Sequence, residues 1–385
     1  MQGICAVFAL LPKVLIRLAS DDYDYLLGRY APGSECMMQN FSAIFWLTKK
    51  SAHLPLMESR QTNIIGIGAG PSRRRDCLLH AHLCMLDPIT LQEILSRAKA
   101  AFIGLAIGDS LGAPVEFMTT HEIKARYGIL NEIVGGGWLR LKPGQVTDDT
   151  QMSLCIARAV IAAKGWSLRG IADNFAEWMK SKPIDVGDTC RKGIRNYMLK
   201  GELEVPYNQW GAGNGACMRM LPVALFTLGD DELLAGYAVE QAHLTHNNTL
   251  SDAACIFYGR LIHLALAGHS KARLRRELEG LFTQCENFRF EPYRGLATGY
   301  VVDTMQTVFH HFFKARNFED CLVGVINQGG DADTTGAIAG MLAGAYFGME
   351  EVPKRWLKKM DRAVLAEVST LAEQLVRLSP LATRN

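Results

Sequence analysis

The sequence predicts an all-α protein, and three observations support this. Apolar residues recur at helical spacing from Thr90 almost to the C-terminus. Residues typical of helix N-caps precede several of these apolar runs. Runs of alternating β-branched residues, which would indicate strands, are nearly absent. The chain has 385 residues, 49% of them hydrophobic. That is enough for a substantial core, so we expect one compact helical domain over residues 88–385.

The first expected helix starts after Thr90. This threonine can form a capping box with Glu93, and apolar residues then follow at helical spacing as far as Leu105. A second helix is expected over residues 150–164, because Gly165 is suited to end it. Both predictions depend on local sequence alone.

The later helices follow from the same signals. Ser167 can cap a helix whose apolar face extends to Met179, and Asp230 can cap another. Pro353 is suited to the first turn of the last helix. Further helices are expected over residues 248–267, 270–282, 296–315, 317–327, 334–347 and 353–378.

Residues 1–85 differ from the rest of the chain. They mix apolar and basic residues without a sustained period. The glycine-rich fragment 66–70 lacks a complete phosphate-binding pattern. We interpret the segment as an N-terminal extension that is either disordered or the product of a mis-called start, with the true start near Met85.

Composition excludes several classes of partner and location. Lys+Arg 41 against Asp+Glu 39 gives a net charge of +2, so no global field attracts nucleic acid. Ten cysteines without a CxxC pair, and no evident export signal, indicate free thiols in a reducing cytoplasm. No apolar stretch approaches the length of a membrane-spanning helix. The longest, 334–349, is rich in Gly and Ala and indicates a closely packed internal helix.

Two acidic clusters each come just before an apolar helix. Residues 147–150 read Thr-Asp-Asp-Thr, and residues 329–335 read Gly-Gly-Asp-Ala-Asp-Thr-Thr. Either cluster alone would be an ordinary helix cap, but together they contain more oxygen ligands than caps can use. Such oxygens suit hard divalent cations. Because a helix N-terminus favours ionised carboxylates, we expect their pKa values to stay low. Glu116 would supply a further carboxylate for a two-metal site.

In this order, five segments resemble the ADP-ribosylglycohydrolase family. They are Gly-Asp-Ser-Leu-Gly-Ala-Pro-Val-Glu at 108–116, Val-Thr-Asp-Asp-Thr-Gln-Met at 146–152, Asp-Val-Gly-Asp-Thr-Cys-Arg at 185–191, Gly-Asn-Gly-Ala at 213–216, and Asn-Gln-Gly-Gly-Asp-Ala-Asp-Thr-Thr-Gly-Ala at 327–337. Each segment is a loose motif, but the ordered set over roughly 90–350 is specific.

The resemblance implies a single orthogonal α-helical domain of the ADP-ribosylglycohydrolase type, with two Mn²⁺ or Mg²⁺ ions beneath an ADP-ribose cleft. The implied metal ligands are Glu116, Thr147, Asp148, Asp149, Asp331, Asp333 and Thr334. The implied catalytic residues are Asp185 and Glu116. Asp185 would act as nucleophile, as general base or as stabiliser of an oxocarbenium-like transition state. The implied ADP-ribose-binding residues are Asp188, Thr189, Cys190, Asn214, Gly215, His246 and Tyr300. Whether Gln209 and Trp210 contact the substrate stays open.

The resemblance also implies a reaction and partners. The reaction is hydrolysis of the N-glycosidic bond between ADP-ribose and an arginine of a target protein, which in one subgroup is dinitrogenase reductase. The implied partners are a PII signalling protein and an ammonium transporter, through which a cytoplasmic enzyme would associate reversibly with the membrane. Two alternatives stay open: a hydrolase of ADP-ribosylserine or other ADP-ribose conjugates, and a non-catalytic relative like a lens crystallin. A metal phosphohydrolase on an unrelated helical fold is disfavoured, because the His-Asp metal pairs typical of that class are not evident in the sequence.

Overall fold

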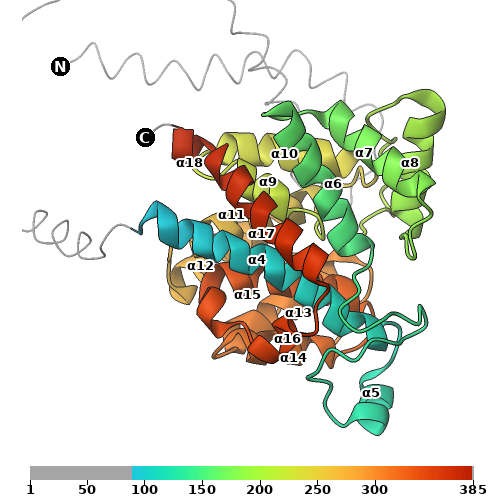
Figure 1. The fold of residues 1–385 in the computed structure, drawn as a ribbon, viewed down its shortest axis with the longest axis vertical. Coiled ribbons are helices and arrows are strands. Elements are labelled where there is room, and N and C mark those ends of the chain that lie inside the picture. Colours follow the sequence, from blue (N-terminus) through green and yellow to red (C-terminus); the bar gives the residue numbers. More distant parts are fainter. Residues whose placement is uncertain (1–88, 384–385) are drawn as a thin grey trace, which may run out of the picture. The chain divides into compact units, whose positions relative to one another are not determined.

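The computed structural model describes residues 89–383, and this part of the chain is all-α (Figure 1). It contains three isolated β-bridges and no strand. The longer helices are α4 (Leu91–Gly112), α6 (Asp148–Ala163), α7 (Leu168–Lys180), α8 (Asp188–Lys200), α10 (Asp231–His243), α11 (Thr249–Leu266), α12 (Lys271–Gln284), α13 (Val301–Lys314), α15 (Ala332–Phe347) and α17 (Arg362–Arg377). The shorter ones are η2 (Ala113–Val115), α5 (Thr120–Tyr127), α9 (Leu221–Phe226), η3 (Glu286–Phe288), α14 (Phe318–Ile326), η4 (Met349–Glu351), α16 (Lys354–Leu357) and α18 (Pro380–Thr383). The prediction of an all-α fold is confirmed.

The predicted N-caps are present. Thr90 and Glu93 form a reciprocal capping box at the start of α4. The Ser167 hydroxyl accepts a hydrogen bond from the Gly170 N–H, and the Asp230 carboxylate accepts one from the Leu233 N–H. Each cap satisfies a backbone donor that the first helical turn leaves without an intrahelical partner.

Two predicted boundaries are wrong. The helix expected from residue 296 starts at Val301, because residues 292–300 form a loop that reaches the acidic clusters. The single helix expected over 353–378 is two helices, α16 and α17. The chain turns between them, where Asp361 caps α17 with its side chain and donates its own N–H to the Gly144 carbonyl. Pro353 lies just before α16 instead of in its first turn. Helices α5, α8 and α9 had not been predicted.

Helices α4 and α15 pack backbone against backbone. A Cβ atom built on Gly336 would lie 2.6 Å from the Gly108 carbonyl oxygen, and one built on Gly112 would lie 2.6 Å from the Asp333 amide nitrogen. Gly104 and Gly340 meet in the same way. Contacts pair rising numbers in α4 with falling numbers in α15, so the helices are antiparallel. The C-terminal end of α4, which leads to Glu116, therefore lies at the start of α15, where the second acidic cluster begins.

Helix α4 also corrects the expectation about membrane spans. The stretch Leu91–Val115 has 25 residues, and its most apolar 18-residue window has a mean hydropathy of 1.2, which is long and apolar enough to cross a bilayer by length and composition alone. However, 94% of that 18-residue window is buried inside the fold, beside helices such as α15 and α17 (Figure 1). Within residues 89–383 this stretch is a core helix of a globular fold.

Candidate active site

The two acidic clusters and Glu116 converge at the end of α4. Carboxylate oxygens of Glu116, Asp331 and Asp333 all lie within 4.8 Å of one another. The hydroxyls of Thr147 and Thr334 both donate to Asp149 Oδ2, over 3.1 and 3.3 Å. The Thr334 bond joins the first cluster, at the start of α6, to the second, at the start of α15. The fold therefore brings together side chains that are more than 200 positions apart in the sequence.

Asp109 fixes the first cluster in place, and the sequence reasoning missed this role. Its buried carboxylate accepts from the Thr147 N–H over 3.0 Å, and from the Thr150 N–H and hydroxyl over 3.2 and 2.6 Å. These are backbone donors that α6 leaves without an intrahelical partner. The available signal was an aspartate inside an otherwise apolar helical run, since an acid buried there needs hydrogen-bonding partners.

The cluster suits a divalent cation. Asp149 is fully buried, and its Oδ1 atom has no hydrogen-bond partner among the described residues. A buried carboxylate oxygen without a partner is costly unless a cation compensates it. Glu116, Asp331 and Asp333 add further oxygens, the ligand type that hard divalent ions prefer. The protein's own groups thus leave an acceptor-rich site that a cation would complete.

Burial and mutual repulsion control the electrostatics here. Desolvation, together with the charges of Asp185, Asp331 and Asp148, raises the pKa of Glu116 to about 8. Burial also raises the pKa of Asp148 to about 7 and that of Asp333 well above its usual range. The expectation of low pKa values was therefore wrong for the protein's own groups, because burial outweighs the helix N-terminus. A bound divalent cation would act in the opposite direction.

Asp185 lies beside this cluster. One of its oxygens accepts from the Val186 N–H over 2.7 Å, and its charge contributes to the raised pKa of Asp148 and Glu116. Burial raises the pKa of Asp185 itself. The Gly187 N–H donates to Asp148 Oδ2 over 3.0 Å, which attaches the start of α8 to the first cluster. Asp185 is thus held at the edge of the site by the same loop.

The Gly213–Gly215 loop borders the other side of Asp331. The Asn214 amide donates to Asp331 Oδ2 over 2.6 Å and to the Thr304 hydroxyl over 3.0 Å. Gly213 forms a β-bridge with Tyr300, whose side chain is 39% exposed. The Asp331 N–H donates to the Ala297 carbonyl, so the 292–300 loop is attached to the same cluster. Asn214, Gly215 and Tyr300 therefore lie together next to the carboxylates.

His246 is buried behind this loop and oriented by a hydrogen-bond chain. The fully buried Arg219 donates to the Thr245 hydroxyl over 2.7 Å, and that oxygen lies 2.8 Å from His246 Nδ1. Arginine has no acceptor, so the hydroxyl hydrogen is directed at Nδ1 and the ring proton belongs on Nε2. Burial lowers the pKa of His246 to about 3, so the ring is neutral. Its Nε2 atom faces Gly213, where an added Cβ would lie 2.8 Å away.

The remaining predicted ligand residues lie on α8. The Asp188 side chain is exposed and forms ion pairs with Arg191 and Lys192 of its own helix, so it does not reach the carboxylate cluster. Thr189 is also exposed. Cys190 is buried and accepts from Arg219 Nη1 over 3.5 Å. No side chain caps α8, so the backbone N–H groups of its first turn are also available to a ligand.

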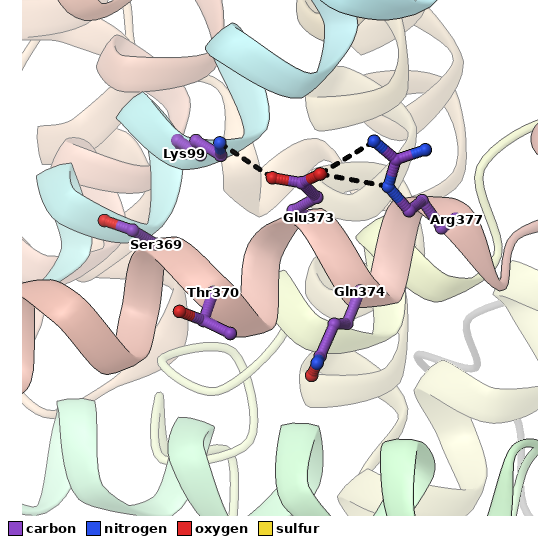
Figure 2. Close-up of a pocket in the computed structure, with 6 residues that line it drawn as sticks. All are labelled: Lys99, Ser369, Thr370, Glu373, Gln374 and Arg377. Atoms are coloured by element: carbon purple, nitrogen blue, oxygen red, sulfur yellow. Dashed lines mark hydrogen bonds and ion pairs between the residues drawn. The ribbon is translucent and has the colours of Figure 1, made fainter.

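A surface groove of about 340 Å³ lies elsewhere, between α4 and α17 (Figure 2). In it, Glu373 is paired with Lys99 of α4 and with Arg377 of its own helix, so one carboxylate is shared by two cations. Lys99 precedes Glu116 by 17 positions, which corresponds to roughly 25 Å of helix. The groove is thus separate from the carboxylate cluster, which is the better candidate for chemistry.

Known proteins resemble most of this chain. The family model of ADP-ribosylglycohydrolases matches residues 90–385. A protein of Rhodospirillum rubrum, "ADP-ribosyl-[dinitrogen reductase] glycohydrolase", is 50% identical over 293 residues, covering 76% of this chain and all of that protein. "ADP-ribosylarginine hydrolase Tri1" of Serratia proteamaculans is 29% identical, covering 75% of this chain and 81% of its own length.

A solved structure has the same fold. It is an "ADP-ribosylglycohydrolase-related protein complex", with a TM-score of 0.66 and 32% sequence identity, covering 75% of this chain and 99% of the matched one. With the carboxylate cluster in place and a family match over most of the chain, the conclusion follows directly: this chain belongs to the ADP-ribosylglycohydrolase family and is an enzyme of that class.

Proposed function

We propose that the enzyme hydrolyses the N-glycosidic bond between ADP-ribose and an arginine side chain, and that its target is dinitrogenase reductase. One observation carries the proposal: this chain is 50% identical to the full length of a relative whose name specifies that target. The reaction breaks the bond between the anomeric carbon and the guanidine nitrogen. Water supplies the hydroxyl to the sugar and the proton to the leaving nitrogen.

We propose that two divalent ions, Mn²⁺ or Mg²⁺, are held by Glu116, Thr147, Asp148, Asp149, Asp331, Asp333 and Thr334. When bound, such ions supply Lewis-acid stabilisation and lower the pKa of water. The partnerless Asp149 Oδ1 and the close carboxylates of Glu116, Asp331 and Asp333 support this assignment. Titrating the metal-free protein with Mn²⁺ in a calorimeter would test it, because the assignment requires about two ions per chain.

The protein's own groups have distinct roles in this proposal. Asp185, fixed by the Val186 N–H, places negative charge beside the sugar, where positive charge develops as the glycosidic bond breaks. The start of α8 and the Gly213–Gly215 loop offer backbone N–H groups to the pyrophosphate. Tyr300, 39% exposed, offers a ring on which the adenine can stack. His246 supports the Gly213–Gly215 loop from behind.

The test is ADP-ribose release from arginine-ADP-ribosylated dinitrogenase reductase, with Mn²⁺ present or chelated, followed by intact mass. Mn²⁺-dependent loss of the modification would support the reaction and the target together. Cleavage of a serine-linked conjugate alone would support metal-dependent hydrolysis but contradict the arginine linkage. No cleavage of any conjugate would contradict the proposal and favour a binding role.

We also propose that residues 88–385 form the ADP-ribosylglycohydrolase domain and that residues 1–85 are an N-terminal extension. The match of the family model to residues 90–385 supports this division. A chain starting at Met85 should unfold at the same temperature as the full chain and keep its activity. A loss of folding in the shortened chain would show that the first 84 residues are structural.

Regulation by membrane association is a further part of the proposal. We propose that a PII signalling protein and an ammonium transporter recruit the cytoplasmic enzyme reversibly to the membrane. Fractionation of cells before and after an ammonium shift would test it. The enzyme should move to the membrane fraction only when both partners are present, and a soluble enzyme under both conditions would refute the idea.

A further inference from the structure

Two exposed aromatic side chains lie directly beside the carboxylate cluster. Phe117 follows Glu116 in the chain and is 68% exposed, and Trp138 is 55% exposed. Their ring centroids are 5.7 Å apart with planes inclined at 43°. The Trp138 indole N–H donates to Glu116 Oε2 over 2.6 Å. Large aromatic rings are costly to leave in water. An exposed pair that is hydrogen-bonded to a site residue therefore indicates a surface that a ligand covers.

The backbone holds Phe117 in an unfavourable conformation. Phe117 has a φ of 63°, the left-handed region that a bulky residue rarely adopts. Its N–H donates to the Gly330 carbonyl, and the Gly330 N–H donates to the Met118 carbonyl. These bonds fix Phe117 against the start of the second acidic cluster. Backbone strain of this kind persists only where the surroundings impose it, and it is concentrated at functional sites.

A glycine-rich turn positions Trp138 in the same way. Gly135, Gly136 and Gly137 all have positive φ values. A Cβ on Gly137 would lie 2.5 Å from the Ala113 carbonyl oxygen, so the turn packs on the end of α4 as only glycine permits. Both rings are therefore placed by rigid backbone contacts with the elements that carry the carboxylates.

The charge around the pair suits a cation. The polar group that Trp138 contacts is the Glu116 carboxylate, whose oxygens lie within 4.8 Å of those of Asp331 and Asp333. A guanidinium is planar, weakly hydrated and able to stack on an aromatic face while it faces carboxylates. Resting on the proposed function, we propose that Phe117 and Trp138 bind the guanidinium of the modified arginine and thereby select the arginine linkage. A serine linkage presents no planar cation to this pair.

The experiment compares Phe117→Leu, which keeps apolar volume but removes the π face, with Phe117→Tyr, which keeps the ring. Leu199→Ala removes a side chain that is 79% exposed at the far end of α8 and is the matched surface control. Each full-length, Mn²⁺-loaded variant is assayed for KM with an ADP-ribosylated arginine peptide, for Ki of methylguanidine, and for Kd of ADP-ribose, which has no guanidine.

Phe117→Leu should raise both KM and the methylguanidine Ki by about 2- to 30-fold and leave the Kd of ADP-ribose unchanged. Phe117→Tyr, which retains the π face, should rescue the KM and Ki defects of Phe117→Leu, and Leu199→Ala should match the wild type. Equal weakening of ADP-ribose binding, or an unchanged KM and Ki, would overturn the inference. A wild-type enzyme that leaves arginine conjugates intact would instead refute the proposed function, and that outcome is seen before any variant is made.

Discussion

Replacing Gly336 with alanine should destabilise the protein through the contact between α4 and α15. The added Cβ would lie 2.6 Å from the Gly108 carbonyl oxygen, whereas real Cβ contacts essentially never fall below 3.0 Å. The helices must therefore separate locally by at least 0.4 Å, the difference between these distances. Overpacking of this kind costs about 1–3 kcal/mol. Alanine's better helix propensity offsets about 0.5–1 kcal/mol of it.

The expected net loss for Gly336→Ala is the difference between these two ranges, about 0–2.5 kcal/mol, which should lower Tm by up to roughly 10 °C. Because the separated helices carry Glu116 and Asp331, the affinity for Mn²⁺ should fall as well. Gly236→Ala is the matched control: it lies in α10, and an added Cβ meets nothing within 4 Å. That control should gain about 0.5–1 kcal/mol. Thermal unfolding and Mn²⁺ calorimetry measure both effects, and equal behaviour of the two variants would refute the packing argument.

Three further predictions concern the site itself. Asp331→Ala should abolish metal-dependent turnover while far-ultraviolet circular dichroism stays unchanged; normal turnover would contradict the metal assignment. Burial lowers the pKa of His246 in the folded state to about 3, below the ordinary 6.5. The contribution of the neutral ring to the free energy of unfolding is therefore fully present above pH 6.5 and is lost as pH falls towards 3. Between pH 7 and pH 5, urea denaturation should therefore show the wild type losing about 2 kcal/mol more than His246→Gln; parallel losses would refute the buried neutral ring. Thr245→Val should lower the free energy of unfolding by about 1–3 kcal/mol, because it leaves buried donor and acceptor groups unpaired. Thr245→Ser should be close to wild type, and equal loss in both variants would mean that the methyl group matters instead.

Local signals predicted the helices well where a cap and an apolar period coincide. Thr90, Ser167 and Asp230 each start a helix as expected. The break at Asp361 was missed because apolar spacing continues across it, and the turn depends on a hydrogen bond to the distant Gly144. A tertiary contact of this kind cannot be predicted from a short sequence window.

The sequence predicted which residues form the candidate site better than it predicted their pKa values and supporting contacts. Ordered motifs indicated which carboxylates would meet, and Glu116, Asp331 and Asp333 do meet. The raised pKa values could not be predicted, because they depend on burial, which the sequence does not specify. The support that Asp109 and Arg219 give from behind the site was also missed. Their partners lie 38 or more and 22 or more positions away, respectively.

The pairing of α4 with α15 has a consequence for biosynthesis. Gly108 and Gly336 are 228 positions apart in the chain. At about 5–20 residues per second, a ribosome needs roughly 10–45 s to deliver the second helix after the first. For that interval, a segment apolar enough to resemble a membrane span lacks the partner that later buries it. During that interval the nascent chain lacks the contact that buries this segment, and it cannot form its carboxylate cluster until residues 331–333 have been synthesised.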